Sequence, residues 1–279
     1  MIRTFIQPAL TFALSAGEPN KSSLSNYRRK LIKTVQNICH LPQRATSHII
    51  FASKLVGGLG FQDPRTEADI QTVVQAMKML ASDDKFVSGV ARGELARTVA
   101  FAAQTNLSPS LTQDFLSGLR TGKFHQDNIR YRTHSLWTRT RSACRCLNIT
   151  FKVLPAGPPT ISINGKGPCP AKYASSFLHR ALQDAVAAEV TALLDQGKVA
   201  QSMIQDPHAN NSSWHFTGLN MRFRDWRFIH RARLNFLPTN QNKARWSDCC
   251  PSCRVCNNHA ETLPHVLCHC DANMVDIRK

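Results

Sequence analysis

Cysteine and histidine residues are concentrated near the C-terminus, at spacings that suit a metal ion. Six of the ten cysteines lie in the last 31 residues, in the run CCPSCRVCNNHAETLPHVLCHC. The spacing Cys253-x2-Cys256-x8-His265-x4-Cys270 supplies three thiolates and one imidazole. Zn²⁺ favours four nitrogen and sulfur ligands in a tetrahedron, and a Cys-x-x-Cys turn lets two sulfurs reach one ion. The pattern predicts a structural zinc site, because four protein ligands leave no position for a catalytic water.

Other residues of this run leave the ligand set open. The surplus candidates are Cys249, Cys250, His259, Cys268 and His269, and the chief rival pair is Cys250-x2-Cys253. The four remaining cysteines, Cys39, Cys144, Cys146 and Cys169, are expected to be small buried or semi-exposed residues. A secreted protein would pair its cysteines in disulfides. Residues 1–17 have the outline of a secretory signal, but Gln7 and Pro8 interrupt its apolar part, so we favour thiols and metal ligands.

The net positive charge of the chain is concentrated in two stretches. The chain carries a net charge of +17, and residues 120–180 and 221–246 hold almost all of it, with 11 basic and one acidic residue in the first and seven and one in the second. The first series contains Arg130, Arg132, Arg139, Arg141 and Arg145. The second contains Arg222, Arg224, Arg227, Arg231, Arg233, Lys243 and Arg245. A basic chain of this kind favours polyanionic partners, with nucleic acid first and an acidic membrane surface second.

Aromatic residues alternate with the cations of the second stretch. They are Phe223, Trp226, Phe228, Phe236 and Trp246. Cations bind phosphates and aromatic faces stack on unpaired bases, so the combination suits a nucleic-acid track. The alternative is an amphipathic helix with a solvated arginine face. We interpret the aromatics as core residues of such a helix and the arginines as phosphate ligands. In the first series, we expect Arg132, Arg139 and Arg145 on one side of a helix.

Helices are predicted for the first third of the chain. Apolar residues at helical spacing predict a helix over about 24–38, which Leu41-Pro42 ends. The Gly57–Gly60 loop lacks the Lys-Ser/Thr of a phosphate-binding loop and is interpreted as a tight packing turn. Asp63-Pro64 predicts a helix start, and the following buried stripe comprises Ile70, Val73, Val74, Met77 and Leu80. Two further helices are expected near 86–105 and 110–120.

The middle of the chain changes to a short alternating pattern. Residues 149–154 and 160–164 alternate apolar and polar residues around a proline-rich turn, which predicts a small hairpin. Residues 165–170 are interpreted as a linker, and an alanine-rich helix should run from about 171 to 196, where Gly197 stops it. The predicted fold class is mainly α, with a small β hairpin and a C-terminal zinc knuckle.

Several of these motifs together resemble a known family. They are the run from Phe228 to Thr239, Arg245-Trp246, Cys253, Cys256, Glu261-Thr262, the run from His265 to Leu267, and Cys270. This set resembles the C-terminal part of the Pol polyprotein of type-1 non-LTR retrotransposons, nearest to the rDNA-inserting group with a restriction-like endonuclease. Residues 31–42 followed by Gly57–Gly60 are similar to the reverse-transcriptase thumb of that family. The likeness covers most of the chain.

The resemblance implies a fragment with a helical thumb-like region at 1–121, a basic linker region at 122–246 and a CCHC zinc knuckle at 247–279. It implies RNA and DNA partners (a template-primer or target duplex) and nuclear localisation. No membrane association is expected, because a crossing needs about 20 predominantly apolar residues and no window keeps charge and proline out for that long. Asp83-Asp84 lies outside the aromatic-x-Asp-Asp setting that a polymerase centre needs, and no endonuclease cluster is present, so we expect the chain alone to be inactive. The alternatives are a host-adopted zinc-containing DNA-binding protein and a secreted disulfide-rich protein.

Overall fold

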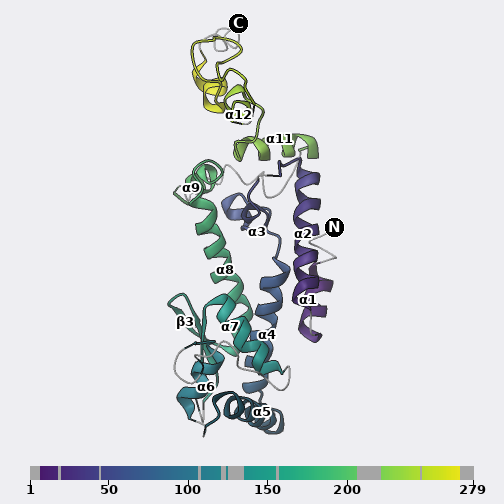
Figure 1. Cartoon of the computed structure of the whole chain (residues 1–279), viewed down its shortest axis with the longest axis vertical. Coiled ribbons are helices and arrows are strands. Elements are labelled where there is room, and N and C mark those ends of the chain that lie inside the picture. Colours follow the sequence, from purple (N-terminus) through teal and green to yellow (C-terminus); the bar gives the residue numbers. More distant parts are fainter. Residues whose placement is uncertain are drawn as a thin grey trace. The chain divides into compact units, whose positions relative to one another are not determined.

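The structure is a computed structural model of the whole chain, shown in Figure 1, and it describes residues 7–17, 20–43, 45–105, 108–120, 124, 135–154, 157–205, 221–245 and 247–270. It is mainly helical with one small antiparallel sheet, which confirms the predicted fold class. The chain divides into two compact units, one of residues 1–30 and 61–185 and the other of residues 31–60 and 186–279. The predicted boundaries at 121 and 246 do not coincide with this division.

The first unit is built mainly of helices, and α4 (Pro64–Leu80) begins at Asp63-Pro64 as predicted. Its helices are α1 (Gln7–Ala16), α4, α5 (Lys85–Ala103), α6 (Pro109–Leu116) and α7 (Leu136–Leu147), joined by the start of α2 (Lys21–Cys39) and most of α8 (Ala174–Thr191). The Asp63 side chain accepts a hydrogen bond from the Arg65 N–H at the start of α4. Ser135 forms a capping box with Thr138 at the start of α7. These side chains satisfy N–H groups that have no partner within the helix.

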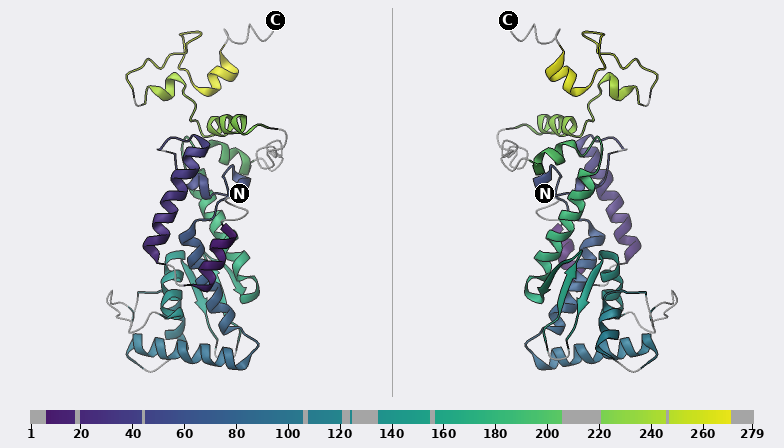
Figure 2. Two further views of the ribbon diagram at one scale, coloured as in Figure 1. Left: turned by 90° about the vertical axis from the view of Figure 1, so that its right-hand side faces the viewer. Right: turned by 90° about the vertical axis from the view of Figure 1, so that its left-hand side faces the viewer.

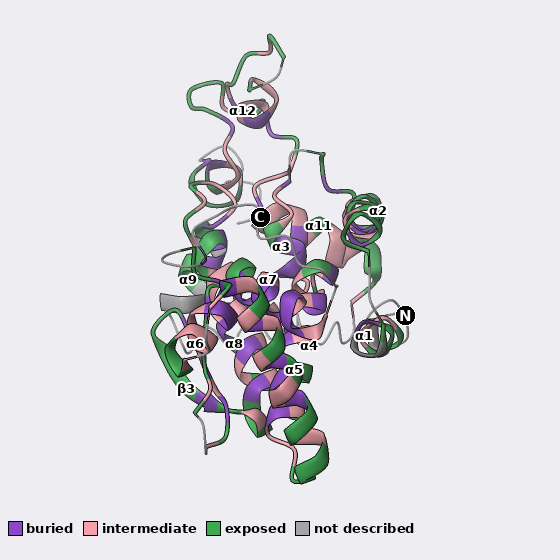
Figure 3. Cartoon of the chain, turned by 60° about the horizontal axis from the view of Figure 1, so that its bottom comes forward, coloured by how far each residue is buried: buried purple, intermediate pink, exposed green. Residues whose placement is uncertain are grey.

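The core of the first unit forms around α4. The predicted stripe of α4 is buried, from Ile70 to Leu80, and α4 packs against α1, α5 and α7. Phe115, at the end of α6, is fully buried and meets the ring of Phe124 edge to face, with centroids 5.6 Å apart. Figure 3 shows buried residues where α4 and α7 lie together and exposed residues along the outer side of α5.

Three short strands complete this unit. They are β1 (Ile149–Lys152), β2 (Thr160–Ile163) and β3 (Lys166–Pro170), in the antiparallel order β1-β2-β3, with Phe151 opposite Ile161 and Ile161 opposite Cys169. Figure 2 shows the strands beside one another. The predicted hairpin is confirmed, but the interpretation of 165–170 as a linker is wrong. Asn164 and Gly165 both have positive φ and form a two-residue hairpin turn, and an edge strand tolerates proline.

The second unit combines the end of α2 with the C-terminal third of the chain. Its elements are α3 (His48–Phe51), η2 (Lys54–Val56), α9 (Lys198–Gln205), α11 (Phe223–Arg233), α12 (Asn240–Lys243) and η6 (His265–His269). The glycine loop is a tight packing turn, as predicted, because a Cβ on Gly58 would lie 2.3 Å from the Ala52 carbonyl oxygen. No helix of the described residues is long and apolar enough to span a membrane.

The alanine-rich helix is shorter than the sequence predicts. It is preceded by the 3₁₀ turn η4 (Ala171–Tyr173), and α8 ends at Thr191 rather than near 196. The Gly197 N–H donates to the Leu193 carbonyl, and a Cβ at Gly197 would lie 2.3 Å from the Val190 carbonyl oxygen. Gly197 therefore lets the chain turn back closely against the end of α8, and α9 begins at the next residue.

An ion pair between buried Glu67 and partly buried His179 joins α4 to α8 within the first unit. Glu67 is buried, and its carboxylate accepts from His179 Nε2 at 2.8 Å and from Gln71 Nε2 at 2.7 Å. His179 Nδ1 lies 2.7 Å from the Ser175 carbonyl oxygen. Both partners of the imidazole are acceptors, so both ring nitrogens donate and the ring is an imidazolium. The hydrogen bond to Glu67 raises the pKa of His179, and for Glu67 the hydrogen bonds lower the pKa although burial opposes them.

This pair should make the stability of the protein depend on pH in two directions. The His179 contribution is complete below its ordinary pKa of 6.5 and is lost as the pH rises through the higher folded value. The Glu67 contribution is present above 4.5 and is lost as the pH falls through the lower folded value. Replacing His179 with Gln should lower the free energy of unfolding by roughly 2–3 kcal/mol at pH 6, because a buried carboxylate loses its cation.

Urea unfolding of wild type and His179→Gln at pH 5.5, 7 and 8.5 measures this effect. The variant should lose less stability than wild type between pH 6.5 and 8.5. His48→Gln is the matched control, because His48 pairs with Glu189 where both side chains are about half exposed, at 45% and 57%. A decline in stability above pH 6.5 that is equally steep in His179→Gln would contradict the assignment.

Candidate metal centre and nucleic-acid interface

The structure brings together the four predicted metal ligands. The ligand atoms of Cys253, Cys256, His265 and Cys270 all lie within 4.8 Å of one another. The Cys253 and Cys270 sulfurs are 4.0 Å apart, and Cys256 Sγ is 3.3 Å from His265 Nε2. A tetrahedral ion with metal–sulfur bonds of about 2.3 Å needs its sulfurs about 3.8 Å apart, so the cluster has the dimensions of a metal site.

A tight turn positions the first two ligands. The Asn257 N–H donates to the Cys253 carbonyl at 2.9 Å, and Asn257 adopts a positive φ of 55° that ends the turn. A bridge between Ser252 and Ala260 closes the loop. Within it, the backbone N–H groups of Cys256 and Val255 lower the pKa of the Cys253 thiol to about 6. Such donors favour the thiolate, which is the form that binds a metal.

A single π-helical turn positions the other two ligands. The helix begins at Leu263, as the sequence predicts, and its π segment is η6, from His265 to His269. A π turn closes hydrogen bonds between residues five apart, so it suits two ligands at His265 and Cys270 better than an α-helix would. The Thr262 hydroxyl accepts from the His265 N–H at 3.1 Å and fixes the start of the turn.

Glu261 connects the loop of residues 252–260, which carries Cys253 and Cys256, to α12. It was not among the predicted site residues. It is buried, and its carboxylate accepts from Arg254 Nη2 at 2.5 Å, from the Arg254 N–H at 3.0 Å and from the Asn240 N–H at 3.1 Å. The hydrogen bond from Arg254 is the main reason that the pKa of Glu261 falls to about 2. Nothing in the local pattern distinguishes Glu261 from a solvated residue, because its partners come from separate segments.

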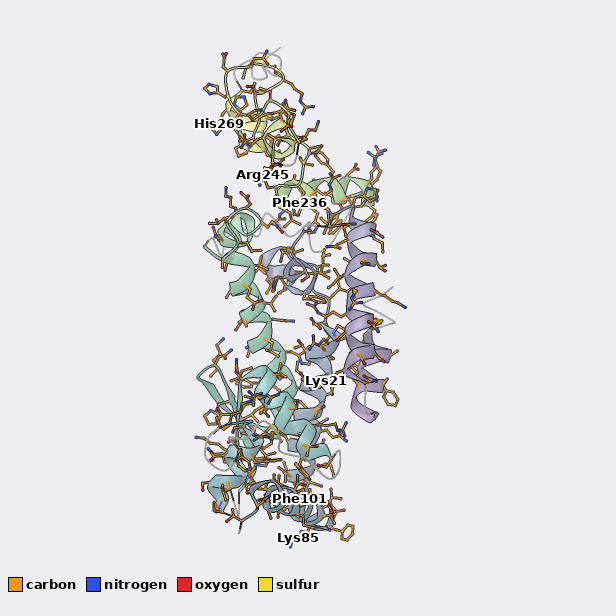
Figure 4. The ribbon with its side chains drawn as sticks, in the orientation of Figure 1. Lys21, Lys85, Phe101, Phe236, Arg245 and His269 are labelled. Atoms are coloured by element: carbon orange, nitrogen blue, oxygen red, sulfur yellow. The ribbon has the colours of Figure 1, made fainter. Side chains whose placement is uncertain are left out.

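The surplus cysteines and histidines lie outside the four-residue cluster. Cys250 is exposed, and its thiol is 3.2 Å from the Ser252 hydroxyl rather than in the cluster. Cys268 and the histidines at 259 and 269 are also exposed, and Figure 4 shows His269 at the outer side of this region. All ten cysteines are described, and none of them forms a disulfide. The geometry thus favours the Cys253-x2-Cys256 register over its rival.

Helix α11 carries most of the second basic stretch, and one of its faces is a stack of rings. Phe223 and Trp226 are stacked with centroids 5.8 Å apart, and Trp226 and the buried His230 are stacked at 4.9 Å. The Arg227 guanidinium lies over the Phe223 ring at 5.1 Å and donates to His40 Nε2 at 2.8 Å. This second contact ties α11 to the end of α2 within the same unit.

The other cations of this stretch differ in exposure. Arg222 and Arg224 are exposed and share the Asp225 carboxylate, at 2.9 and 3.3 Å. Arg245 is exposed and pairs with Asp195 at 2.8 Å. Those that are half-buried are Arg227, Arg231, Arg233 and Lys243. Burial lowers the pKa of Arg233. Arg222, the N-cap residue of α11, and Arg224 in its first turn are therefore more accessible to a phosphate than the half-buried cations.

The interpretation of the aromatic residues as core is wrong for two of them. Phe223 is 54% exposed and Phe228 is 58% exposed. Trp226 and Phe236 are half-buried, and Trp246 lies outside the described residues. The helix is short and has neighbours on only part of its circumference, so its apolar positions cannot all be covered. Exposed rings next to exposed guanidinium groups are what a stacking platform for bases requires.

In the first basic series, Arg141 is buried rather than solvent-facing, and its expected role as a nucleic-acid ligand is wrong. Its guanidinium donates to the carbonyl groups of Phe115 and Leu119, both at 2.7 Å, and lies over the Phe115 and Phe124 rings. This arginine caps the end of α6. A series of arginines cannot reveal which member faces the core, because the carbonyls that bind it lie more than 20 residues away in the sequence.

The rest of the first series is divided between different surroundings. Arg139 lines a cavity of about 310 Å³ with Lys21 and Arg65, whereas exposed Arg145 lies against Gly118 after α6. The expected common face of Arg139 and Arg145 is therefore wrong. Arg130 and Arg132 lie outside the described residues. A Cβ on Gly118 would be 2.6 Å from that of Arg145, so this glycine, with φ of 73°, permits the close approach.

Comparisons of the chain with models of protein families, with curated proteins and with solved structures find no match. The geometry of the residues therefore carries the functional argument.

Proposed function

We propose that the four-residue cluster binds one Zn²⁺ and that the ion is structural. Three sulfurs and one imidazole nitrogen at tetrahedral spacing form the donor set that Zn²⁺ prefers over oxygen-binding ions such as Mg²⁺. Cys253 and Cys270 are buried, and only short turns surround them. A segment with so small an apolar core depends on the metal for its fold. The ion would hold the loop that Glu261 connects to α12.

We propose further that the protein binds nucleic acid through α11. The observation that carries this proposal is the exposure of Phe223 and Phe228 on the short helix that carries exposed Arg224 and is preceded by exposed Arg222. Exposed arginines contribute to solubility wherever they lie, and exposed rings on the same helix add a surface on which bases can stack. Phosphate contacts would supply most of the affinity, and stacking would favour unpaired bases.

The resemblance to retrotransposon Pol polyproteins supports the same class of partner. In such a polyprotein, this segment would grip the template-primer duplex or position target DNA, and the palm and endonuclease would be supplied by other segments. A host-adopted DNA-binding protein of the same construction is the alternative. Both candidates use α11 and the zinc knuckle in the same way, so a binding experiment tests what they share.

The salt dependence of binding tests the role of α11. For wild type, the affinity for a labelled RNA–DNA hybrid duplex should fall steeply with salt, because each neutralised phosphate contributes about 0.9 to the log–log slope. Arg222→Gln combined with Arg224→Gln should reduce that slope by about 2 if both cations contact phosphate. The measurement is fluorescence anisotropy at several salt concentrations, with circular dichroism to verify folding.

The control variant removes the same charge elsewhere. Arg29 and Lys30 are exposed on α2 and belong to neither basic stretch, so Arg29→Gln with Lys30→Gln should leave the slope near that of wild type. Equal slopes for wild type and the folded α11 variant would remove α11 from the interface. Equal losses in both variants would show that net charge, and not a localised site, determines the affinity.

A further inference from the structure

A pocket of about 440 Å³ lies within the second unit, between the end of α2 and the segment that follows α11. From α2 and the turn after it come Gln36, Asn37, His40, Leu41 and Pro42; from the other side come Arg231, Phe236 and Pro238. The volume is in the range of pockets that bind small organic ligands. Phe236, which is labelled in Figure 4, supplies a phenyl ring to the pocket.

The end of α2 supplies polar side chains to this pocket. His40 adopts a positive φ of 51°, and the Leu41 N–H donates to the Gln36 carbonyl at 2.8 Å, which closes the helix end. Arg227 donates to His40 Nε2 at 2.8 Å. A guanidinium cannot accept a hydrogen bond, so Nε2 accepts, and a neutral His40 ring carries its proton on Nδ1. Its second nitrogen is then a hydrogen-bond donor.

Gln36, Asn37 and Arg231 add further hydrogen-bonding groups to the pocket. Gln36 and Asn37 bring carboxamides, which both donate and accept, and Asn37 is exposed. Arg231 Nη2 donates to the Phe236 carbonyl at 3.3 Å, while Arg231 Nε is buried and has no partner among the described residues. The pocket therefore offers a phenyl ring and two proline rings for apolar contact. Two carboxamides, His40 and Arg231 offer hydrogen bonds. This combination suits a planar heterocycle with a polar edge.

We propose that this pocket binds one unpaired nucleobase of a single strand whose phosphates lie along α11. This inference rests on the proposed nucleic-acid binding and specifies it. The base would stack on Phe236 and present its polar edge to Asn37 and Gln36. Arg231 belongs to both features, since it lines the pocket and lies in the last turn of α11. Phe228, which is exposed and lies three residues before Arg231 on α11, offers a second stacking position for a neighbouring base.

Two ligands separate base recognition from phosphate attraction. One is a fluorescein-labelled thymidine ten-mer, and the other is a ten-mer of the same phosphodiester backbone without bases. Wild type should bind the thymidine ten-mer at least tenfold more tightly, since stacking of a single base typically contributes that much. The double variant Asn37→Ala with Phe236→Leu should lose about tenfold for the thymidine ten-mer and keep its affinity for the abasic strand.

Thr34→Ala is the matched control, because Thr34 is exposed on the same helix and does not line the pocket. It should change neither affinity. If circular dichroism shows that the double variant does not fold, the single variant Asn37→Ala replaces it as the test. Its affinity should fall about threefold for the thymidine ten-mer and stay unchanged for the abasic strand. If the pocket variants bind the thymidine ten-mer as tightly as wild type does, or lose affinity for both ligands equally, the pocket does not bind a base. The proposed α11 interface would still stand. Failure of wild type to bind either strand overturns both.

Discussion

Cys256→Ser combined with His265→Ala should release the metal and unfold residues 247–270. Wild type should contain one zinc per chain by elemental analysis, and the double variant should contain none. The apparent free energy of binding at such structural sites is about 10–16 kcal/mol, and it appears as folding free energy because the metal site does not exist in the unfolded segment. Hydrogen exchange should show loss of protection in this segment and retained protection in α4 and α7.

Cys250→Ser and Cys268→Ser are the matched controls for the metal assignment. Both cysteines are exposed and lie outside the cluster, so each variant should retain its zinc and its protection from exchange. Loss of the ion from Cys250→Ser would mean that Cys250-x2-Cys253 supplies the ligands instead. Full zinc content in the double variant would show that the four-residue cluster is not the site.

Arg141→Ala should produce the largest loss of stability among the arginines of α7, about 3–4 kcal/mol. The substitution removes the donors to the Phe115 and Leu119 carbonyls, each bonded at 2.7 Å, and leaves a cavity beside the Phe115 and Phe124 rings. The Phe115 carbonyl would keep only the Gly118 N–H, at 3.0 Å, and the Leu119 carbonyl would lose its bond to Arg141. Because whole domains are stable by only about 5–15 kcal/mol, urea unfolding should show the effect clearly.

Arg145→Ala provides the comparison on the same helix. Arg145 is exposed, so its replacement should change the free energy of unfolding by no more than about 0.5 kcal/mol. If Arg141→Ala were as stable as Arg145→Ala, the hydrogen bonds of Arg141 would contribute little and its burial would need another explanation. In a folded Arg141→Ala protein, the salt slope of nucleic-acid binding should equal that of wild type.

The sequence by itself determined the elements that depend on interactions between residues close together in the chain. Asp63-Pro64 placed the start of α4, because an aspartate accepts from the second N–H of its own helix. Alternation placed β1 and β2, and the spacing from Cys253 to Cys270 identified four residues that converge. A metal site can be predicted from sequence when all its ligands lie within 18 residues, because short turns bring the ligand side chains together almost regardless of the rest of the fold.

Tertiary structure decided the features that depend on distant partners. Residues 166–170 form a strand because β2 offers them an edge, and Arg141 is buried because the carbonyls of α6 require donors. Phe223 and Phe228 remain exposed because only part of α11 is covered. Two interleaved units arise because segments far apart in the sequence pack together. Composition states which side chains can be buried or can bind, but packing between remote segments selects those that do.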